Sequence, residues 1–140
     1  MKLRVVWVGK TKNPQLTKLC EDYIGRIRHF LPVEIAEVKD EAKLVAALDP
    51  SDRVIALDPK GKAWTSDQFA EFLQQHMTAD SRRLTFVIGD YAGLLPTVKK
   101  RADIHWSLSP LTFTHDLTRV LLLEQIYRAL SIIRNFPYAK

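Results

Sequence analysis

The chain has 140 residues, 46% of them hydrophobic, which is enough for one domain that buries about two thirds of its unfolded surface. Its 21 lysines and arginines against 16 aspartates and glutamates give a charge of +5, which favours polyanions only weakly. Cys20 is the only cysteine, so an internal disulfide and a cysteine-based metal site are excluded, and we expect a reducing, cytoplasmic location.

The predicted elements alternate between strands and helices. Helical segments separate the strands; one starts with Asn13 before a proline, and another starts with a capping box from Thr65 to Gln68. Cys20 falls in the first helix, where we interpret it as a small buried filler. The pattern predicts one α/β domain over residues 1–140, with helices on both faces of a mainly parallel sheet of five to six strands. The strand-like runs are residues 3–8, 33–38, 54–57, 84–88 and 104–108.

Three loops that follow predicted strands carry glycine or small residues: 57–62 (LDPKGK), 88–93 (IGDYAG) and 107–112 (SLSPLT). Ligands of open α/β sheets bind beyond the carboxyl ends of the strands, so these loops predict a small-molecule pocket. Gly89 and Gly93 suit positive φ or a close backbone approach to a ligand. Ordinary strand-to-helix turns explain the loops equally well when they are taken alone.

Motifs for several other chemistries are missing from the sequence. The segment VGKTK at residues 8–12 is similar to the end of a phosphate-binding P-loop, but Arg4 stands where that motif needs glycine. The four histidines have no partner at the spacing of metal ligands, so we expect no metal. A G-x-S-x-G nucleophile elbow is also absent, which leaves a hydrolase interpretation without support.

An aliphatic helix precedes a C-terminal tail that ends in aromatic residues. On a helical wheel its apolar residues fill about half of the circumference, and Leu121 and Ile132 form a second apolar patch. Two apolar surfaces suggest two partners, its own sheet and a second subunit, although a monomer that buries both sides gives the same pattern. The helix carries too many charges to span a membrane. Its predicted polar strip consists of Glu124, Arg128, Ser131 and Asn135.

Together these segments resemble the ribosomal RNA large subunit methyltransferase H family of SPOUT methyltransferases, nearly end to end. The resemblance rests on VWVGK, LDPKGK, FVIGDYAGL, the stretch SLSPLTFTHDLTRVLLLEQIYRA and the tail that ends in Tyr138. It implies a homodimer with a C-terminal trefoil knot, an exception to the rule that chains avoid knots. It also implies an enzyme that uses S-adenosylmethionine to methylate N3 of a pseudouridine in the 23S rRNA of assembled ribosomes.

The same resemblance implies roles for individual residues. His115 and Tyr138 are implied as catalytic groups that handle a proton, and the tail is implied to reach the cofactor site of the other subunit. Arg119, Arg128 and Lys140 are implied as RNA-binding groups. Methyl transfer from a sulfonium needs positioning and the loss of one proton, but no metal and no enzyme nucleophile. The implied cofactor contacts are Leu57, Gly89, Leu108, Ser109, Pro110, Leu111, Thr112 and Phe113.

The chain departs from the family pattern at three positions. Asp90 replaces the second of two glycines, Thr114 replaces a proline and Ala139 replaces a histidine. Asp90 brings a negative charge beside the cofactor loop, where it would obstruct the cofactor or rearrange its contacts. Two alternatives to an enzyme for this rRNA therefore stay open: a non-catalytic RNA- or ribosome-binding protein on the same scaffold, and a methyltransferase that acts on another RNA.

Overall fold

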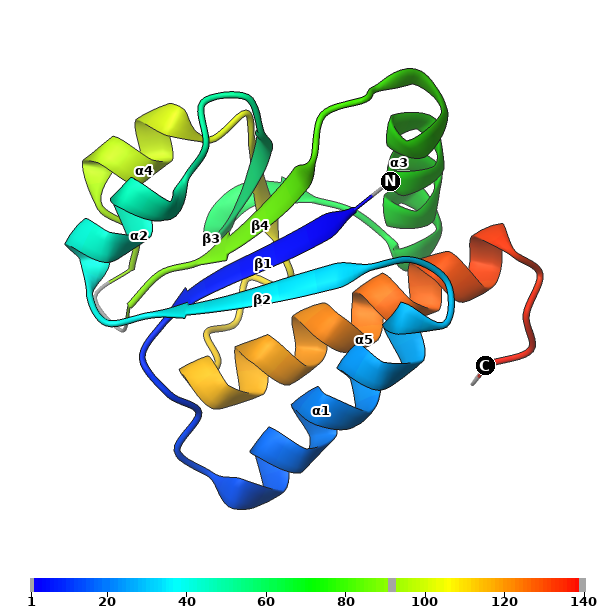
Figure 1. Cartoon of the computed structure of the whole chain (residues 1–140), viewed down its shortest axis with the longest axis horizontal. Helices are drawn as coiled ribbons and strands as arrows, with labels where there is room; N and C mark the ends of the chain where they lie inside the picture. Colours follow the sequence, from blue (N-terminus) through cyan, green and yellow to red (C-terminus); the bar gives the residue numbers. More distant parts are fainter. Residues whose placement is uncertain (1, 91–92, 139–140) are drawn as a thin grey trace.

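A computed structural model describes residues 2–90 and 93–138, and the strands in this part of the chain form one five-stranded sheet (Figure 1). The strand order is β2-β1-β4-β3-β5, and neighbouring strands pair in parallel. This arrangement confirms the predicted, mainly parallel sheet. The strands are β1 (Leu3–Val8), β2 (Val33–Val38), β3 (Arg53–Ala63), β4 (Leu84–Ile88) and β5 (Ile104–Ser107).

Helices cover both faces of the sheet, as predicted. α1, α3 and α5 pack on one face, and α2 and α4 pack on the other (Figure 1). Both predicted helix starts are confirmed: Asn13 Oδ1 accepts from the first amides of α1, and Thr65 and Gln68 bond each other's backbone N–H at the start of α3. The helices are α1 (Pro14–Arg28), α2 (Glu41–Ala47), α3 (Ser66–Ala79), α4 (Pro96–Arg101) and α5 (His115–Ile133).

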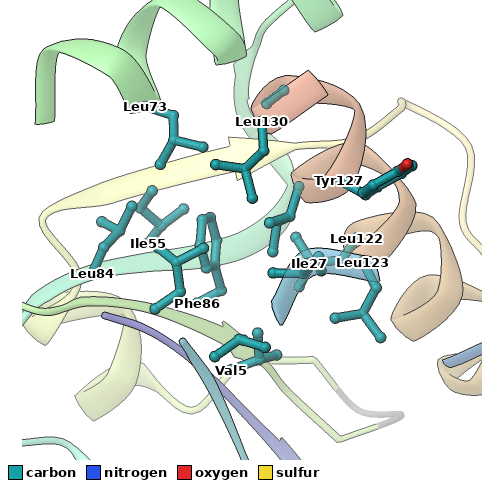
Figure 2. Close-up of a cluster of buried hydrophobic side chains, with 14 of the residues drawn as sticks. Val5, Ile27, Ile55, Leu73, Leu84, Phe86, Leu122, Leu123, Tyr127 and Leu130 are labelled. Atoms are coloured by element: carbon teal, nitrogen blue, oxygen red, sulfur yellow. The ribbon is translucent and has the colours of Figure 1, made fainter. Parts of the chain in front are cut away.

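The main core lies between the sheet and the three helices α1, α3 and α5. Figure 2 shows Phe86 and Ile55 from the sheet facing Leu122 and Leu130 from α5, all of them fully buried. Burying one such side chain stabilises the fold by about 1.5–3 kcal/mol, so α5 is tied firmly to the sheet. Cys20 is buried in the same core, and its burial raises the pKa of the thiol to about 11, as expected for a filler residue.

The order of the strands creates a crevice at the carboxyl ends of β1 and β4. These strands are neighbours, with Val5 opposite Phe86 in the register. The helix after β1 packs on one face of the sheet, whereas the helix after β4 packs on the other. A crevice of this kind is where open α/β sheets bind their ligands. The fold therefore predicts a ligand site at the loops after β1 and β4.

The structure corrects the predicted polar strip of α5. Ser131 is buried, because the neighbouring helices enclose this part of α5. Its Oγ donates a hydrogen bond to the Tyr127 carbonyl at 2.9 Å. Asn135 lies beyond the end of the helix, with a φ of 52°. Glu124 and Arg128 do share a partly exposed side, where they form an ion pair at 2.8 Å. No helix among the described residues combines the length and the apolar character needed to cross a membrane.

Candidate functional site

A pocket of about 190 Å³ opens at the carboxyl edge of the sheet, beyond β3, β4 and β5. We call it the apolar pocket, because most of its lining surface is apolar. Seven of the eight residues implied as cofactor contacts line it, and Pro110 is the exception. They come from strand β3 and from the loops after β4 and β5, which only the fold brings together. Its apolar lining residues are Leu57, Ile88, Leu94, Leu108, Leu111 and Phe113.

Glycines shape the wall that follows β4. Gly93 has a φ of +90°, and its amide donates to the Asp90 carbonyl at 2.7 Å. Gly93 and Leu94 lie close to Gly89, where an added Cβ would be 2.8 Å from the Gly93 carbonyl oxygen and 2.9 Å from Leu94 Cδ2. Any side chain at position 89 would therefore push this wall of the pocket out of place.

The segment expected as a loop after β3 is instead an excursion within that strand. Leu57 and Lys62 both pair with Trp106 of β5, so residues 58–61 bulge out and the strand then resumes. The bulge returns close to β5, because a Cβ at Gly61 would lie only 2.6 Å from the His105 carbonyl. The prediction of a loop was wrong, but the excursion still places Leu57 at the pocket wall.

The loop after β5 closes the other side of the apolar pocket. Ser107 Oγ donates to the Ser109 carbonyl, and Ser109 Oγ accepts from the Leu111 amide, both at 3.0 Å. These hydrogen bonds hold the loop in a turn without support from a helix. The Leu111 side chain lines the pocket and is 70% exposed, so it stands at the open side, where a bound ligand would cover it.

A second, larger cavity of about 920 Å³ lies beside the apolar pocket, between the loop after β1 and the start of α5. We call it the basic groove, because Lys10, Lys12 and Lys39 line it. Four residues line both cavities, so the two share one wall. The shared residues are Asp90, Thr112, Phe113 and His115.

The loop after β1 is held against the first turns of α5. Asp116 Oδ2 accepts from the backbone amides of Lys12 at 3.0 Å and Asn13 at 2.9 Å. Arg119 donates from Nη2 to the Val8 carbonyl at 2.6 Å and from Nη1 to Thr11 Oγ1 at 3.0 Å. Two residues of α5 therefore fix the loop that carries Lys10 and Lys12.

The predicted catalytic residues His115 and Tyr138 lie apart along α5. His115 begins the helix beside the two cavities, and Glu124, nine residues later, is roughly 14 Å away along the helix axis. Tyr138 folds back to this middle part of α5, where its hydroxyl donates to Glu124 Oε2 at 2.9 Å and lies 3.1 Å from the Tyr23 hydroxyl. One chain therefore does not bring its own two catalytic candidates together.

The environment of Tyr138 keeps its hydroxyl protonated. Burial, followed by the hydrogen bonds with Tyr23 and Glu124, raises the pKa of Tyr138 well above the ordinary range for tyrosine. Arg128 pairs with Glu124 and stacks over the Tyr138 ring, with its guanidinium carbon 5.1 Å from the ring centre. In this conformation the tail is a hydrogen-bond donor rather than a base.

The structure changes the interpretation of the predicted RNA-binding residues. Arg119 is only 2% exposed, and its guanidinium carbon stacks over the Trp7 ring, 4.8 Å from the ring centre. The guanidinium therefore connects α5 with β1 and is not an exposed phosphate contact. Burial lowers the pKa of Arg119. Arg128 is partly exposed beside Tyr138, and Lys140 lies outside the described residues.

Sequence reasoning missed the groove lysines. In the sequence, Lys10 and Lys12 belong to an incomplete P-loop match and Lys10 also ends the VWVGK segment, but neither pattern gives these lysines a role, and no motif singles out Lys39. A usable signal is present, because all three follow the carboxyl ends of β1 and β2. Among the described residues, no group of three or more histidine, cysteine, aspartate or glutamate side chains is arranged to hold a metal ion.

Comparison with solved structures identifies the class of fold. A probable methyltransferase from Bordetella pertussis Tohama I superposes with a TM-score of 0.61 at 13% identity, covering 91% of this chain and 93% of that one. The SpoU methyltransferase AviRb from Streptomyces viridochromogenes, solved with AdoMet, gives a TM-score of 0.53 at 14% identity over 89% of this chain and 56% of that one. At these identities the likeness shows the fold, which is the α/β methyltransferase fold of these proteins.

Sequence comparison narrows the class to a family. The model for predicted SPOUT methyltransferases matches residues 1–139. Curated relatives called ribosomal RNA large subunit methyltransferase H are 40% identical in Trichlorobacter lovleyi, over 99% of both chains, and 38% identical in Solibacter usitatus, over 100% of both chains. The chain therefore belongs to the ribosomal RNA large subunit methyltransferase H family of SPOUT methyltransferases.

Proposed function

We propose that this protein transfers a methyl group from S-adenosylmethionine to N3 of a pseudouridine in the 23S rRNA of the large ribosomal subunit. The convergence of strand β3 and the loops after β4 and β5 on the apolar pocket carries the proposal, because they hold residues 57, 89 and 108–113, which the family resemblance implies as cofactor contacts. Membership of a family whose relatives are named for this substrate supports the choice of RNA.

The apolar pocket fits the cofactor by the chemistry of its lining. Leu108, Leu111 and Phe113 present an apolar surface suited to an adenine ring, and Gly89 leaves the backbone accessible for hydrogen bonds. When bound, S-adenosylmethionine supplies an electrophilic methyl group on a sulfonium. The task of the protein is then to orient the target base in line with that methyl group and to exclude competing water.

The position of His115 supports a role in handling the imide proton of the base. Its side chain lines both cavities, so a base in the basic groove approaches it from one side and the apolar pocket lies on the other. A neutral imidazole is suited to accepting a proton near neutral pH. We assign it that role.

We propose a cytoplasmic homodimer in which the tail of one subunit completes the site of the other. The separation of His115 and Tyr138 along α5 supports this arrangement, because one chain does not join them. Exposed apolar side chains on and after α5 offer a surface for the partner, among them Leu117, Ile132 and Phe136. The trefoil knot implied by the family belongs to the same proposal.

A mixed-subunit experiment tests the composite site. We expect His115→Ala to be inactive, and a chain truncated after Asn135 to be inactive as well. Heterodimers formed from the two should regain activity, because each contains one site with an intact His115 and an intact tail. Methylation of ribosomes that lack the modification would be followed with labelled S-adenosylmethionine. Full activity of the truncated chain alone would contradict the role of the tail.

Binding and methylation assays distinguish the proposed enzyme from the two alternatives, a non-catalytic ribosome-binding protein and a methyltransferase for another RNA. Asp90 lines the apolar pocket, so a non-catalytic ribosome-binding protein remains a specific competitor. Calorimetric titration with S-adenosylhomocysteine tests it: micromolar binding at one site per subunit supports the enzyme, and ribosome association without cofactor binding supports the scaffold protein. Cofactor binding with an unmodified pseudouridine would indicate a different RNA substrate.

A further inference from the structure

We propose that the basic groove holds the RNA strand at the target nucleotide, with Lys10, Lys12 and Lys39 contacting its phosphates. The inference rests on the proposed function and extends it, because the family resemblance assigns no role to any of these lysines. It also moves the main phosphate contacts from the buried Arg119 to side chains that line an open cavity.

The position of the groove is the first argument. Val8 and Asp90, which line it, end or follow the neighbouring strands β1 and β4. The chain leaves these two strands toward opposite faces of the sheet, which opens a crevice that ligands of α/β proteins use. The groove is also far larger than the apolar pocket, about 920 Å³ against 190 Å³, and so can admit a nucleotide with its flanking backbone.

The charge of the groove is the second argument. Among residues 2–90 and 93–138, no ion pair or side-chain hydrogen bond occupies the ammonium groups of Lys10, Lys12 and Lys39. Two carboxylates line the groove as well, but Asp116 is already bound to two backbone amides through Oδ2. Asp90 is the other, at the wall shared with the apolar pocket.

Arg119 adds a buried positive charge behind the same surface. Its guanidinium donates to a carbonyl and a hydroxyl, both neutral, and its Nε has no hydrogen-bond partner within the described part of the chain. The carboxylates of Asp116 and Glu37 act on Arg119 through Coulombic attraction. The groove lining still holds four basic side chains against two carboxylates, which leaves its potential positive. Phosphate oxygens are the ligands that such a surface attracts.

The geometry of the shared wall relates the lysines to the chemistry. Asp90, Thr112, Phe113 and His115 separate the groove from the apolar pocket. A strand held by the lysines therefore presents its bases to this wall, beyond which the methyl donor binds under the proposed function. The loop that carries the first two lysines is fixed by hydrogen bonds from α5, so little ordering is needed when RNA binds.

The test compares two variants that remove the same charge. Lys10→Gln/Lys12→Gln neutralises the groove, and the matched control Lys99→Gln/Lys100→Gln neutralises exposed lysines of α4, which line neither cavity. Three quantities are measured: affinity for S-adenosylhomocysteine, KM for 70S ribosomes in methylation, and the salt dependence of binding to a labelled oligouridine RNA. Lys39→Gln provides a third variant from a different loop.

We expect the groove variant to raise KM for ribosomes at least tenfold and to leave the affinity for S-adenosylhomocysteine unchanged. Each lost phosphate contact lowers the slope of log affinity against log salt by about 0.7 for single strands, so the slope should fall by roughly 1.4. The control Lys99→Gln/Lys100→Gln should change KM for ribosomes by no more than about twofold and should leave the salt slope unchanged. Lys39→Gln should lower the salt slope by about half as much as the groove variant does.

Each other outcome overturns the inference in a defined way. An unchanged KM and slope would place the RNA elsewhere, and an equal loss in the control would mean that only net charge matters. Loss of affinity for S-adenosylhomocysteine would mean that the lysines serve the cofactor. If the wild type failed to methylate ribosomes, the proposed function would fail, while the oligouridine comparison would still decide whether the groove binds RNA.

Discussion

The two edges of the sheet use charged residues in opposite ways. At the amino edge, the buried Asp52 carboxylate accepts from Arg83 Nη2 at 2.9 Å and from Thr85 Oγ1 at 2.8 Å. At the carboxyl edge, Lys10 and Lys12 face a cavity, and no ion pair with the described residues occupies them. Charges that satisfy each other stabilise the fold, whereas charges left facing a cavity are available to a ligand. This difference supports the proposed ligand site at the carboxyl edge.

His76 shows how fully the amino edge is satisfied. Its ring is buried, and Arg53 Nη1 lies 3.2 Å from Nδ1 while the Arg82 carbonyl lies 3.0 Å from Nε2. An arginine only donates, so Nδ1 accepts and the proton sits on Nε2, which donates to the carbonyl. Both ring nitrogens of this neutral histidine are therefore used inside the protein, which leaves none for a ligand.

The largest expected effect comes from filling the carboxyl edge. Gly89→Val should abolish binding of S-adenosylhomocysteine, a loss of at least about a hundredfold, because the new side chain displaces Gly93 and Leu94. Calorimetry measures the binding, and thermal unfolding shows that the fold persists. Gly25→Ala is the matched control, since a Cβ there meets nothing within 4 Å; it should leave binding unchanged and stabilise α1 by about 0.5–1 kcal/mol. Normal binding by Gly89→Val would show that the apolar pocket is not the cofactor site.

A substitution at the amino edge should lower stability and leave cofactor binding intact. Asp52→Asn should lower the free energy of unfolding by about 3 kcal/mol, because Arg83 loses its buried charged partner and one of the two accepting oxygens becomes an amide NH2 that cannot accept. Cofactor affinity should not change. Urea unfolding measures the first quantity and calorimetry the second. The neighbouring Asp49→Asn removes the same charge at an exposed position and should cost less than about 1 kcal/mol. If Asp52→Asn weakened cofactor binding in the folded protein, the division between the two edges would be wrong.

The smallest effect expected is a pH dependence that originates at the amino edge. Burial lowers the pKa of His76 below its ordinary value of about 6.5. The unfolded chain then binds the proton more readily than the folded chain, so this contribution to stability is complete above about pH 6.5 and declines as the pH falls through the lower, folded value. Urea unfolding between pH 8 and pH 5 should show the decline, and His76→Gln should show a flatter profile. Identical profiles would mean that His76 titrates alike in both states.

Local patterns predicted much of the fold and part of the site. The strands, the caps at Asn13 and Thr65, and the burial of Cys20 are confirmed, because each depends on residues close in sequence. The bulge at residues 58–61 was not predicted, because Gly61 and the β5 backbone that it contacts are far apart in the chain. The role of Arg119 was hidden for a similar reason: its acceptors in and after β1 lie more than a hundred residues before it.

The order of residues alone established the alternation of strands and helices, the glycine-bearing loops at the strand ends, and the family to which the chain belongs. It took the folded chain to show that these loops enclose one pocket, that the lysines after β1 and β2 line a groove beside it, and that His115 and Tyr138 stand apart. The two kinds of information differ because hydrophobic periodicity and helix caps act over a few residues. A site at the edge of a parallel sheet is assembled by strand order and by contacts such as Asp116 with Lys12, which span most of the chain.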